Sequence, residues 1–423
     1  MGLALLLREY ERAAIGDRWD PEVRVVPTHV VASLEALQSD QASEIFRVER
    51  RAIQAQQWVG TVGFGDYALE LLPKIDRADA LGVRRNLMSM LEVGGLVPHL
   101  ESGETQIAGA GETLLDAYLA LFVRRLAREW RRGPIRDYRR EERERKYLRG
   151  KLLVSEQLRA SLRRPHHFVT SADELTNDAP LSRLLKAALV ICHRYALSHD
   201  LRQEARALLG EFAEVAEVSA GESVAGVELD RRHARFESLA ELARLLVGFR
   251  SPDRPGSAST FSLVFDMNVV FERFIAAHVA RICVSLGMRA SSQESGRSLL
   301  LHNGKKRFAL RPDIAIYVRG ELRCLIDTKW KRLDPSASHA GVIQADMYQM
   351  YAYGKEYRCP RVVLLYPRHG ALSAHVATYR HTPGEIDSPI IEVRTVDVSA
   401  DRQSVLAELE SLLMNEGDTI AGT

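Results

Sequence analysis

The segment FALRPDIAIYVRGELRCLIDTKWKR (residues 308–332) carries the most informative structural pattern in the chain. Two apolar, β-prone runs, residues 314–318 and 322–326, flank Arg319-Gly320-Glu321, which is the pattern of a β-hairpin. Asp313 precedes the first run, and Asp327 and Lys329 follow the second. Because side chains alternate between the two faces of a strand, Asp327 and Lys329 are expected to share one face.

The length of the turn decides whether the two aspartates meet. With a three-residue loop, Val318 lies opposite Leu322, and Asp313 then falls opposite Asp327 on the same face. A two-residue loop places the two carboxylates on opposite faces. The sequence therefore predicts a three-residue or bulged turn if the hairpin carries an acidic site.

Two neighbouring carboxylates need a nearby cation if both are to stay ionised. At a separation of about 4 Å and an effective dielectric of about 20 they repel each other by about 4 kcal/mol. Oxygens of Asp313 and Asp327, with a backbone carbonyl and waters, suit Mg²⁺ or Mn²⁺. Lys329 is then placed to orient or deprotonate a water and to stabilise charge on a phosphate. This set of residues predicts metal-assisted hydrolysis of a phosphodiester.

The motif letters alone are not specific. Pro-Asp also occurs at residues 252–253, and acid-x-Lys also occurs at residues 144–146. Those copies fall in a predicted linker and in a predicted charged helix. Only Pro312-Asp313 and Asp327-Thr328-Lys329 lie on paired apolar strands, so the context carries the prediction.

Two predicted helices flank the hairpin. On the helix at residues 265–286, Glu272 lies either close to the core-facing side or at the edge of that face with access to solvent. After the hairpin, Asp346 and Gln349 share one helical face, with Tyr353 one turn beyond. The alternative for this second helix is an aromatic core helix whose polar residues cap it or face water.

The chain is expected to be a multi-domain α/β protein with three segments. Residues 1–104 form a β-rich N-terminal domain of short strands and turns, in which Glu70 points outward. Residues 105–255 form a helical middle region that ends in the linker SPDRPGSAS at residues 251–259. Residues 256–423 combine the hairpin with further helices and strands at residues 346–357, 361–366, 390–398 and 404–414, which predicts a sheet covered by helices.

The middle region contains a basic stripe. Residues 124–151 hold thirteen Lys and Arg against five Asp and Glu. Two interpretations remain open, a stripe that contacts phosphates and a long solvated helix with ion pairs between successive turns.

Composition limits the classes of protein. A net charge of +2 over 423 residues gives no global field for polyanions, so such contacts must be local. The four cysteines lack metal-ligand spacing and lie in or beside apolar runs, which indicates buried free thiols of a reducing cytoplasm. No stretch approaches the length of a membrane span.

Together these motifs resemble the PD-(D/E)xK nuclease fold. The fuller pattern FDMNVVFERF, LRPDIAI, LIDTKWKRL and DMYQMYAYG is similar to the C-terminal domain of the McrC family, the nuclease subunits of McrBC-type modification-dependent restriction systems. Weaker similarity extends over VGTVGFGDYALELLPKI, YLRGKLLVSEQL and SADELTNDAPLSRLLKAAL, and thus over most of the chain.

This resemblance implies both a site and partners. Asp313, Asp327 and Lys329 match the family's catalytic set, Glu272 matches the helix acid that joins the two aspartates at the metal, and Gln349 matches the motif after the triad. The implied partner is a GTP-hydrolysing AAA+ ring of the McrB type, which recognises modified double-stranded DNA and is engaged by the N-terminal part. Two alternatives are a mainly non-catalytic subunit that activates the ring's GTPase, and a stand-alone DNA repair nuclease.

Overall fold

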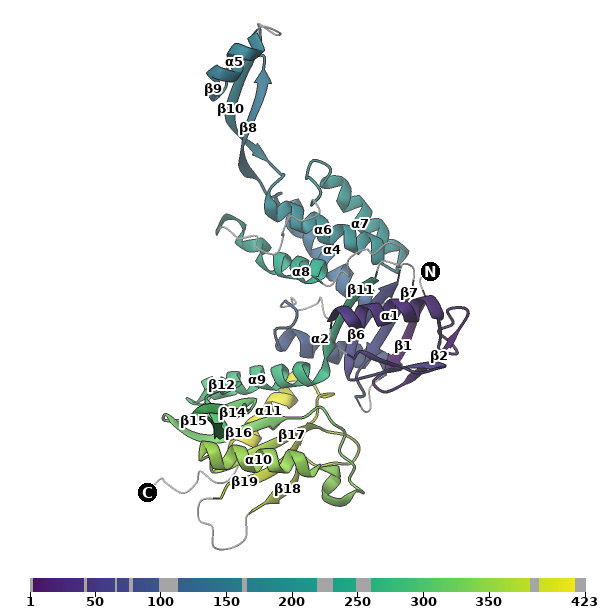
Figure 1. The fold of residues 1–423 in the computed structure, drawn as a ribbon, viewed down its shortest axis with the longest axis vertical. Coiled ribbons are helices and arrows are strands. Elements are labelled where there is room, and N and C mark those ends of the chain that lie inside the picture. Colours follow the sequence, from purple (N-terminus) through teal and green to yellow (C-terminus); the bar gives the residue numbers. More distant parts are fainter. Residues whose placement is uncertain are drawn as a thin grey trace. The chain divides into compact units, whose positions relative to one another are not determined.

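The computed structural model describes residues 3–41, 44–64, 67–75, 79–98, 113–161, 166–218, 231–248, 260–380 and 388–414. The chain divides into two compact units (Figure 1). The large unit holds residues 3–115 and 253–423, and the small unit holds residues 116–252. This differs from the three predicted segments, because the first and third belong to one unit. The predicted linker lies outside the described residues, at the boundary between the units.

The N-terminal part of the large unit is built on two four-stranded sheets, ordered β1-β7-β6-β11 and β3-β2-β5-β4. The first contains β1 (Leu3–Arg8), β6 (Trp58–Phe64), β7 (Tyr67–Leu72) and β11 (Thr260–Asp266). The second contains β2 (Arg12–Gly16), β3 (Val25–Pro27), β4 (Phe46–Val48) and β5 (Ala52–Ala55). Side chains of both sheets share one buried core, which includes Leu5, Val26, Leu34 and Val62.

Strand β11 explains why the two ends of the chain form one unit. It follows the predicted linker, yet it pairs antiparallel with β6, from Thr260 opposite Phe64 to Asp266 opposite Trp58. Asp266 then caps helix α9 (Met267–Ser285) by accepting a hydrogen bond from the backbone N–H of Asn268 at 2.8 Å. The N-terminal sheet is therefore connected directly to the helix that carries Glu272.

Two helices of the N-terminal part do not appear in the sequence prediction of short strands and turns. They are α1 (Thr28–Gln41) and α2 (Ala80–Val93). The prediction that Glu70 points outward is wrong, because its side chain is buried. Its carboxylate forms a bidentate pair with Arg84 of α2, at 2.6 Å for both bonds, and accepts a hydrogen bond from Leu114 N at 3.0 Å.

The C-terminal part of the large unit is a six-stranded sheet ordered β12-β15-β16-β17-β19-β18. Its strands are β12 (Arg289–Ser292), β15 (Ile314–Val318), β16 (Glu321–Thr328), β17 (Arg361–Pro367), β18 (His375–Tyr379) and β19 (Ile390–Val396). The central strands β16, β17 and β19 are parallel, whereas β12, β15 and β18 run antiparallel to their neighbours. The sheet covered by helices that the sequence predicts is therefore present.

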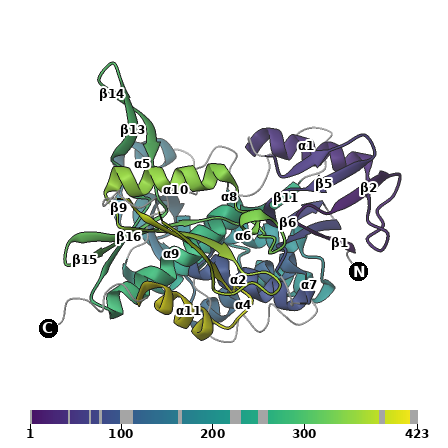
Figure 2. The same ribbon diagram turned by 90° about the horizontal axis from the view of Figure 1, so that it is seen from below.

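Helices cover both faces of this sheet. Helix α10 (Gln344–Tyr357) lies on one face, and α9 with α11 (Arg402–Met414) lies on the other (Figure 2). Val362, Leu364 and Val393 belong to the core under α10 together with Met350 and Tyr353. Strands β13 (Arg297–His302) and β14 (Lys305–Leu310) form a separate two-stranded sheet beside α10.

The small unit combines a helical body with an arm (Figure 1). The body contains α4 (Leu114–Arg132), α6 (Pro180–Tyr195), α7 (His199–Glu211), α8 (Glu237–Gly248) and the 3₁₀ helix at Arg231–Phe236. The arm contains β8 (Asp137–Arg145), β9 (Lys151–Leu152), β10 (Phe168–Thr176) and α5 (Val154–Ser161).

The interpretation of the basic stripe as one long solvated helix is wrong. Helix α4 ends at Arg132, and the stripe continues into β8, which pairs along its length with β10. The charges pair across strands instead of along a helix, since Glu174 accepts bonds from Arg143 and Arg145 at 2.9 and 2.7 Å. The acid-x-Lys copy at residues 144–146 thus lies at the end of a strand.

All four cysteines are buried and free, as predicted from their neighbours. Within the described residues, no helix is both long and apolar enough to span a membrane.

Candidate functional site

The candidate site begins at the β15–β16 hairpin, whose predicted register is confirmed in the bulged form. The loop has two residues, because Val318 pairs with Glu321. Arg319 and Gly320 both have positive φ, 52° and 88°, as a tight primed turn requires. A bulge at Arg323 then shifts the register, so that Ile316 pairs with Cys324 and Ile314 with Ile326. The next step of this register brings Asp313 opposite Asp327.

Asp313 is fixed by the end of the neighbouring strand. Its Oδ2 accepts hydrogen bonds from both the backbone N–H and the Oγ1 hydroxyl of Thr328, each at 2.7 Å. These two bonds set the orientation of the carboxylate, so its Oδ1 is held in a defined direction.

Asp327 is a buried carboxylate beside a lysine. Its side chain is 2% exposed, and Lys329 Nζ lies 2.7 Å from its Oδ2. Burial and the charge of Asp313 raise the pKa of Asp327 to about 7, although Lys329 opposes the shift. Burial alone lowers the pKa of Lys329, but the charges of Asp327 and Asp313 outweigh it and the pKa rises. Lys329 is therefore a cation at neutral pH.

A third carboxylate, which the site prediction did not include, lies near this pair. Asp346 of α10 is buried, receives hydrogen bonds from Lys331 Nζ at 3.0 and 3.3 Å, and accepts one from Tyr366 Oη at 3.3 Å. Its negative charge acts on both Asp327 and Lys329. The i,i+3 relation of Asp346 to Gln349 was the signal in the sequence, but only the packing of α10 on β17 brings Asp346 to the site.

Glu272 is half-buried on α9. It is therefore neither fully on the core-facing side of the helix nor fully open to solvent, the two positions considered from the sequence. Its carboxylate accepts a hydrogen bond from Gln293 Nε2 at 2.9 Å, and Gln293 N donates to Asp313 O at 2.8 Å. Burial raises the pKa of Glu272, the bond from Gln293 lowers it, and the charge of Asp313 raises it again, with a net increase. Gln293, which no sequence pattern marked, thus connects the helix acid to the strand acid.

Gln349 lies one step further from the acid pair. Its Nε2 donates to Tyr353 Oη at 2.7 Å, and Tyr353 Oη donates to Arg311 O at 3.0 Å, two residues before Asp313. Tyr353 is buried, and its burial together with the charge of Asp327 raises its pKa to about 12. The core interpretation of the tyrosines holds for Tyr353, whereas Tyr348 and Tyr351 are exposed.

The acid pair fits a hard divalent cation. Asp327 Oδ2 is buried beside the Lys329 ammonium at 2.7 Å, and both bonds of Asp313 with Thr328 go to Oδ2, so that Oδ1 of Asp313 can bind a cation. One or two carboxylates completed by waters is the usual environment of Mg²⁺. Among the described residues no group of three or more His, Cys, Asp or Glu is arranged to hold a metal, and Glu272 bonds to Gln293 instead.

A pocket lies beside the segment that follows Lys329. This pocket of about 260 Å³ is lined by Glu9, Tyr10, Lys74, Trp330, Lys331, Arg332, Pro367 and His369. Buried Glu9 binds Trp330 Nε1 with both oxygens at 3.0 Å and accepts a hydrogen bond from Lys74 N at 2.9 Å. Burial raises the pKa of Glu9 to about 7 against these bonds. The N-terminal sheet is thereby fixed to the residue that follows Lys329.

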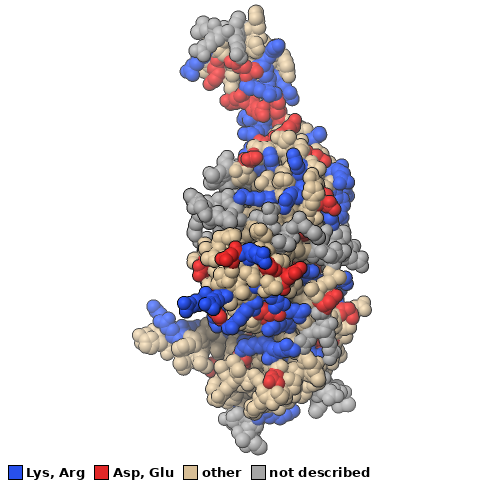
Figure 3. Space-filling model, turned by 90° about the vertical axis from the view of Figure 1, so that its right-hand side faces the viewer, with Lys and Arg blue, Asp and Glu red and all other residues tan. Residues whose placement is uncertain are grey.

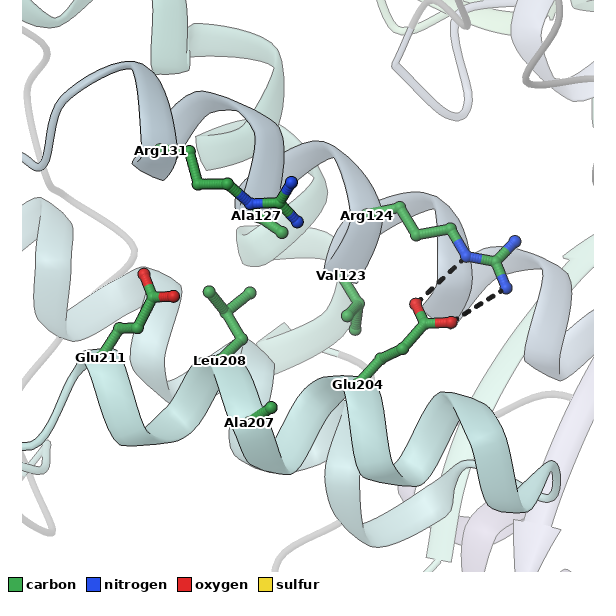
Figure 4. A pocket seen from close by; sticks show the side chains of 8 residues that line it. All are labelled: Val123, Arg124, Ala127, Arg131, Glu204, Ala207, Leu208 and Glu211. Carbon is green, nitrogen blue, oxygen red and sulfur yellow. Dashed lines mark hydrogen bonds and ion pairs between the residues drawn. The ribbon is translucent and has the colours of Figure 1, made fainter.

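A second pocket, in the small unit, has no such chemistry. It occupies about 300 Å³ between α4 and α7, and Arg124 and Glu204 bridge it with bonds of 3.2 and 3.4 Å (Figure 4). Figure 4 shows Arg131 on α4 and Glu211 on α7 at the other end of the groove. A partly exposed pair such as Arg124–Glu204 contributes about 0–1 kcal/mol, and we assign the groove a structural role.

The fold and the site together define a multi-domain α/β protein whose C-terminal sheet holds two aspartates and a lysine at one end of its central strand. A family model described as "McrBC 5-methylcytosine restriction system component" matches residues 53–367. The chain belongs to this family of restriction-system components.

Solved structures agree with this assignment at the level of the fold. A chain in the refined half-complex from a tetradecameric assembly of Thermococcus gammatolerans McrB AAA+ hexamers with bound McrC is 18% identical, with a TM-score of 0.77 over 97% of this chain and 99% of that chain. A chain in the cryo-EM structure of the T. gammatolerans McrBC complex is 22% identical, with a TM-score of 0.54 over 70% and 90%. No curated protein matches the chain.

Proposed function

We propose that this chain is the DNA-cleaving subunit of a McrBC-type restriction system, a PD-(D/E)xK endonuclease that hydrolyses phosphodiesters with Mg²⁺ or Mn²⁺. The observation that carries the proposal is the pairing of buried Asp327 with Lys329 at 2.7 Å, in the register that brings Asp313 to the same face. A purely structural sheet has no need of a half-buried carboxylate beside a buried one, because their repulsion lowers stability.

In this proposal the chain's own residues have separate roles. Asp313 and Asp327 would hold the divalent cation, with Glu272 as the third acid, and the cation would supply Lewis-acid polarisation of the phosphate and a more acidic water. Thr328 keeps the Asp313 carboxylate oriented through its two bonds. Lys329, a cation at neutral pH, stabilises the negative charge that develops on the phosphate. Gln349 acts through Tyr353 on the backbone of Arg311 and so positions Asp313.

The proposed partner is a GTP-hydrolysing AAA+ ring that delivers modified double-stranded DNA and whose GTPase this chain stimulates. The family assignment and the fold shared with a chain from an assembly titled as McrB AAA+ hexamers with bound McrC support this part.

The test compares Asp313→Asn, Asp327→Asn and Lys329→Met in the complete complex with its partner ring. We expect each variant to lose cleavage of methylated duplex DNA by at least about 100-fold, while GTPase stimulation stays within about twofold. Asp334→Asn is the matched control, because this aspartate lies on the same segment but only closes an exposed turn with Ser336.

The outcomes separate the alternatives. Cleavage retained by the aspartate variants refutes the proposed site. If the wild-type complex stimulates GTP hydrolysis but does not cut, the chain is an activating assembly subunit. If the isolated chain cuts DNA with metal and without nucleotide, it is a stand-alone nuclease.

A further inference from the structure

The β13–β14 hairpin is a separate ribbon that nothing in the catalytic scheme uses. Its two strands pair only with each other among the described residues, and the ribbon projects beside α10 (Figure 2). Its residues are exposed on both faces, apart from half-buried Ser298 and from Leu310 at the base. An isolated two-stranded ribbon is marginally stable in water, so an exposed one of this kind is expected to gain stability from a bound partner.

The Lys and Arg side chains give the ribbon a purely positive charge. Between residues 296 and 312 the chain has five cations, Arg297, Lys305, Lys306, Arg307 and Arg311, and no Asp or Glu. The projecting element carries Lys and Arg and no acidic residues on the face seen in Figure 3. The overall balance of +2 therefore hides a local concentration of positive charge next to the candidate site.

Apolar side chains accompany these cations on both faces. Leu300 lies opposite Arg307, and Leu301 lies opposite Lys306, so each face combines an apolar and a cationic side chain. Leu301 and Phe308 are 71% and 70% exposed. The turn at Asn303-Gly304, with φ of 52° and 71°, is a tight two-residue turn that keeps the ribbon narrow.

The base of the ribbon is fixed to the candidate site. Tyr357 Oη donates to Leu310 O at 2.8 Å and lies 3.2 Å from Glu294 O, so α10 holds both ends of the ribbon. Only Arg311 and Pro312 separate β14 from Asp313, and Tyr353 binds Arg311 O. A molecule bound to the ribbon is therefore held at a fixed position relative to Asp313 and Asp327.

We propose that the β13–β14 ribbon is a DNA-contact element, which rests on the proposed nuclease function and adds the surface that holds its substrate. The major groove of B-DNA admits a two-stranded β-ribbon. Lys305, Lys306 and Arg307 contact phosphates, and Leu301 and Phe308 contact base edges, where thymine methyl groups offer apolar surface. A second copy of this chain is the poorer occupant, because two ribbons with only positive charges repel each other.

The test uses the full chain and a fluorescein-labelled 30-base-pair duplex, with affinity measured by anisotropy between 50 and 300 mM KCl. The triple variant Lys305→Ala/Lys306→Ala/Arg307→Ala is expected to bind at least about tenfold more weakly at 100 mM salt. The slope of log affinity against log salt should become shallower by about 2–3, since each lost phosphate contact removes about 0.9.

Two further variants test whether the effect comes from the positive charges of the ribbon in particular. Arg12→Ala/Arg18→Ala/Arg47→Ala removes the same charge from three exposed residues of the N-terminal part, and is expected to leave the slope unchanged. Lys305→Gln/Arg307→Gln keeps a polar side chain at both positions and the Lys306 bond to Gly296 O, and is expected to reduce the slope by about 2.

The proposal is overturned if the wild-type chain does not bind the duplex at 50 mM salt, if the triple variant keeps the wild-type slope, or if both triple variants lose affinity equally. A change of oligomeric state in light scattering with DNA binding intact also overturns it, and identifies a second copy as the occupant. Asp313→Asn separates the two proposals, since it tests cleavage and is expected to leave the salt slope unchanged.

Discussion

Replacing Asp327 with asparagine should stabilise the metal-free protein at pH 8. Folding raises the pKa of this carboxyl from 3.8 to about 7 because burial and Asp313 disfavour its charge. The native state therefore binds more protons than the unfolded chain between these values, and stability falls as the pH rises from about 4 to about 7. A shift of about 3 pKa units corresponds to about 4 kcal/mol at pH 8.

This figure already includes the attraction of Lys329, which opposes the rise in the pKa of Asp327. The lysine is partly exposed and can turn to water once the carboxylate is removed, so we expect a net gain of about 4 kcal/mol. This corresponds to an increase in Tm of about 6–8 °C for a unit of this size. At pH 5 the gain should fall to about 1–2 kcal/mol, because the carboxyl of the unfolded chain is already ionised there while that of the native protein is mostly protonated.

The assay is thermal unfolding of the full chain in EDTA at pH 5 and pH 8, with Asp401→Asn as a control of equal charge at an exposed helix start. Addition of Mg²⁺ should then stabilise the wild type and leave Asp327→Asn unchanged, because a ligand that binds only the native state raises its stability. A lower Tm of Asp327→Asn at pH 8 in EDTA would refute the reasoning, since it would mean that the buried carboxylate stabilises the fold.

Three further predictions follow from buried polar groups. Glu70→Ala should destabilise the large unit by about 3–5 kcal/mol in denaturant unfolding, because it leaves Arg84 and Leu114 N without their acceptor; an unchanged midpoint contradicts this. Glu9→Gln should raise Tm more at pH 8 than at pH 5, since it keeps an acceptor for Trp330 Nε1 and removes a carboxyl of raised pKa, whereas Glu9→Ala should cost about 1–3 kcal/mol at both; equal effects of the two variants contradict this. Arg145→Ala should increase hydrogen exchange in β8 and β10 and leave α6 protected, because Arg145 binds Thr170 O, Thr170 Oγ1 and Glu174 at 2.7–3.0 Å within the arm; an unchanged exchange rate in β10 contradicts this.

The local sequence predicts helices and strands well wherever the periodic pattern and the turn that ends it lie within one short segment. The hairpin at residues 314–326, helices α9 and α10 and the strands β17 and β19 follow from alternation or helical spacing close to the observed bounds. Asp313 precedes the first strand of this hairpin and Asp327 and Lys329 follow the second, and the structure brings the three together.

The sequence by itself determined that two aspartates and a lysine lie at the ends of paired apolar strands, because strand alternation is a property of neighbouring residues. Only the tertiary structure decided which register brings the aspartates together, since a bulge at Arg323 offsets a two-residue turn. Tertiary contacts also decided that the basic stripe becomes a strand, that Glu70 is buried by Arg84, and that Glu9 reaches Trp330 across 321 positions. Such contacts depend on burial and charge pairing between distant segments, and their energies outweigh the weak local preferences that a sequence window contains.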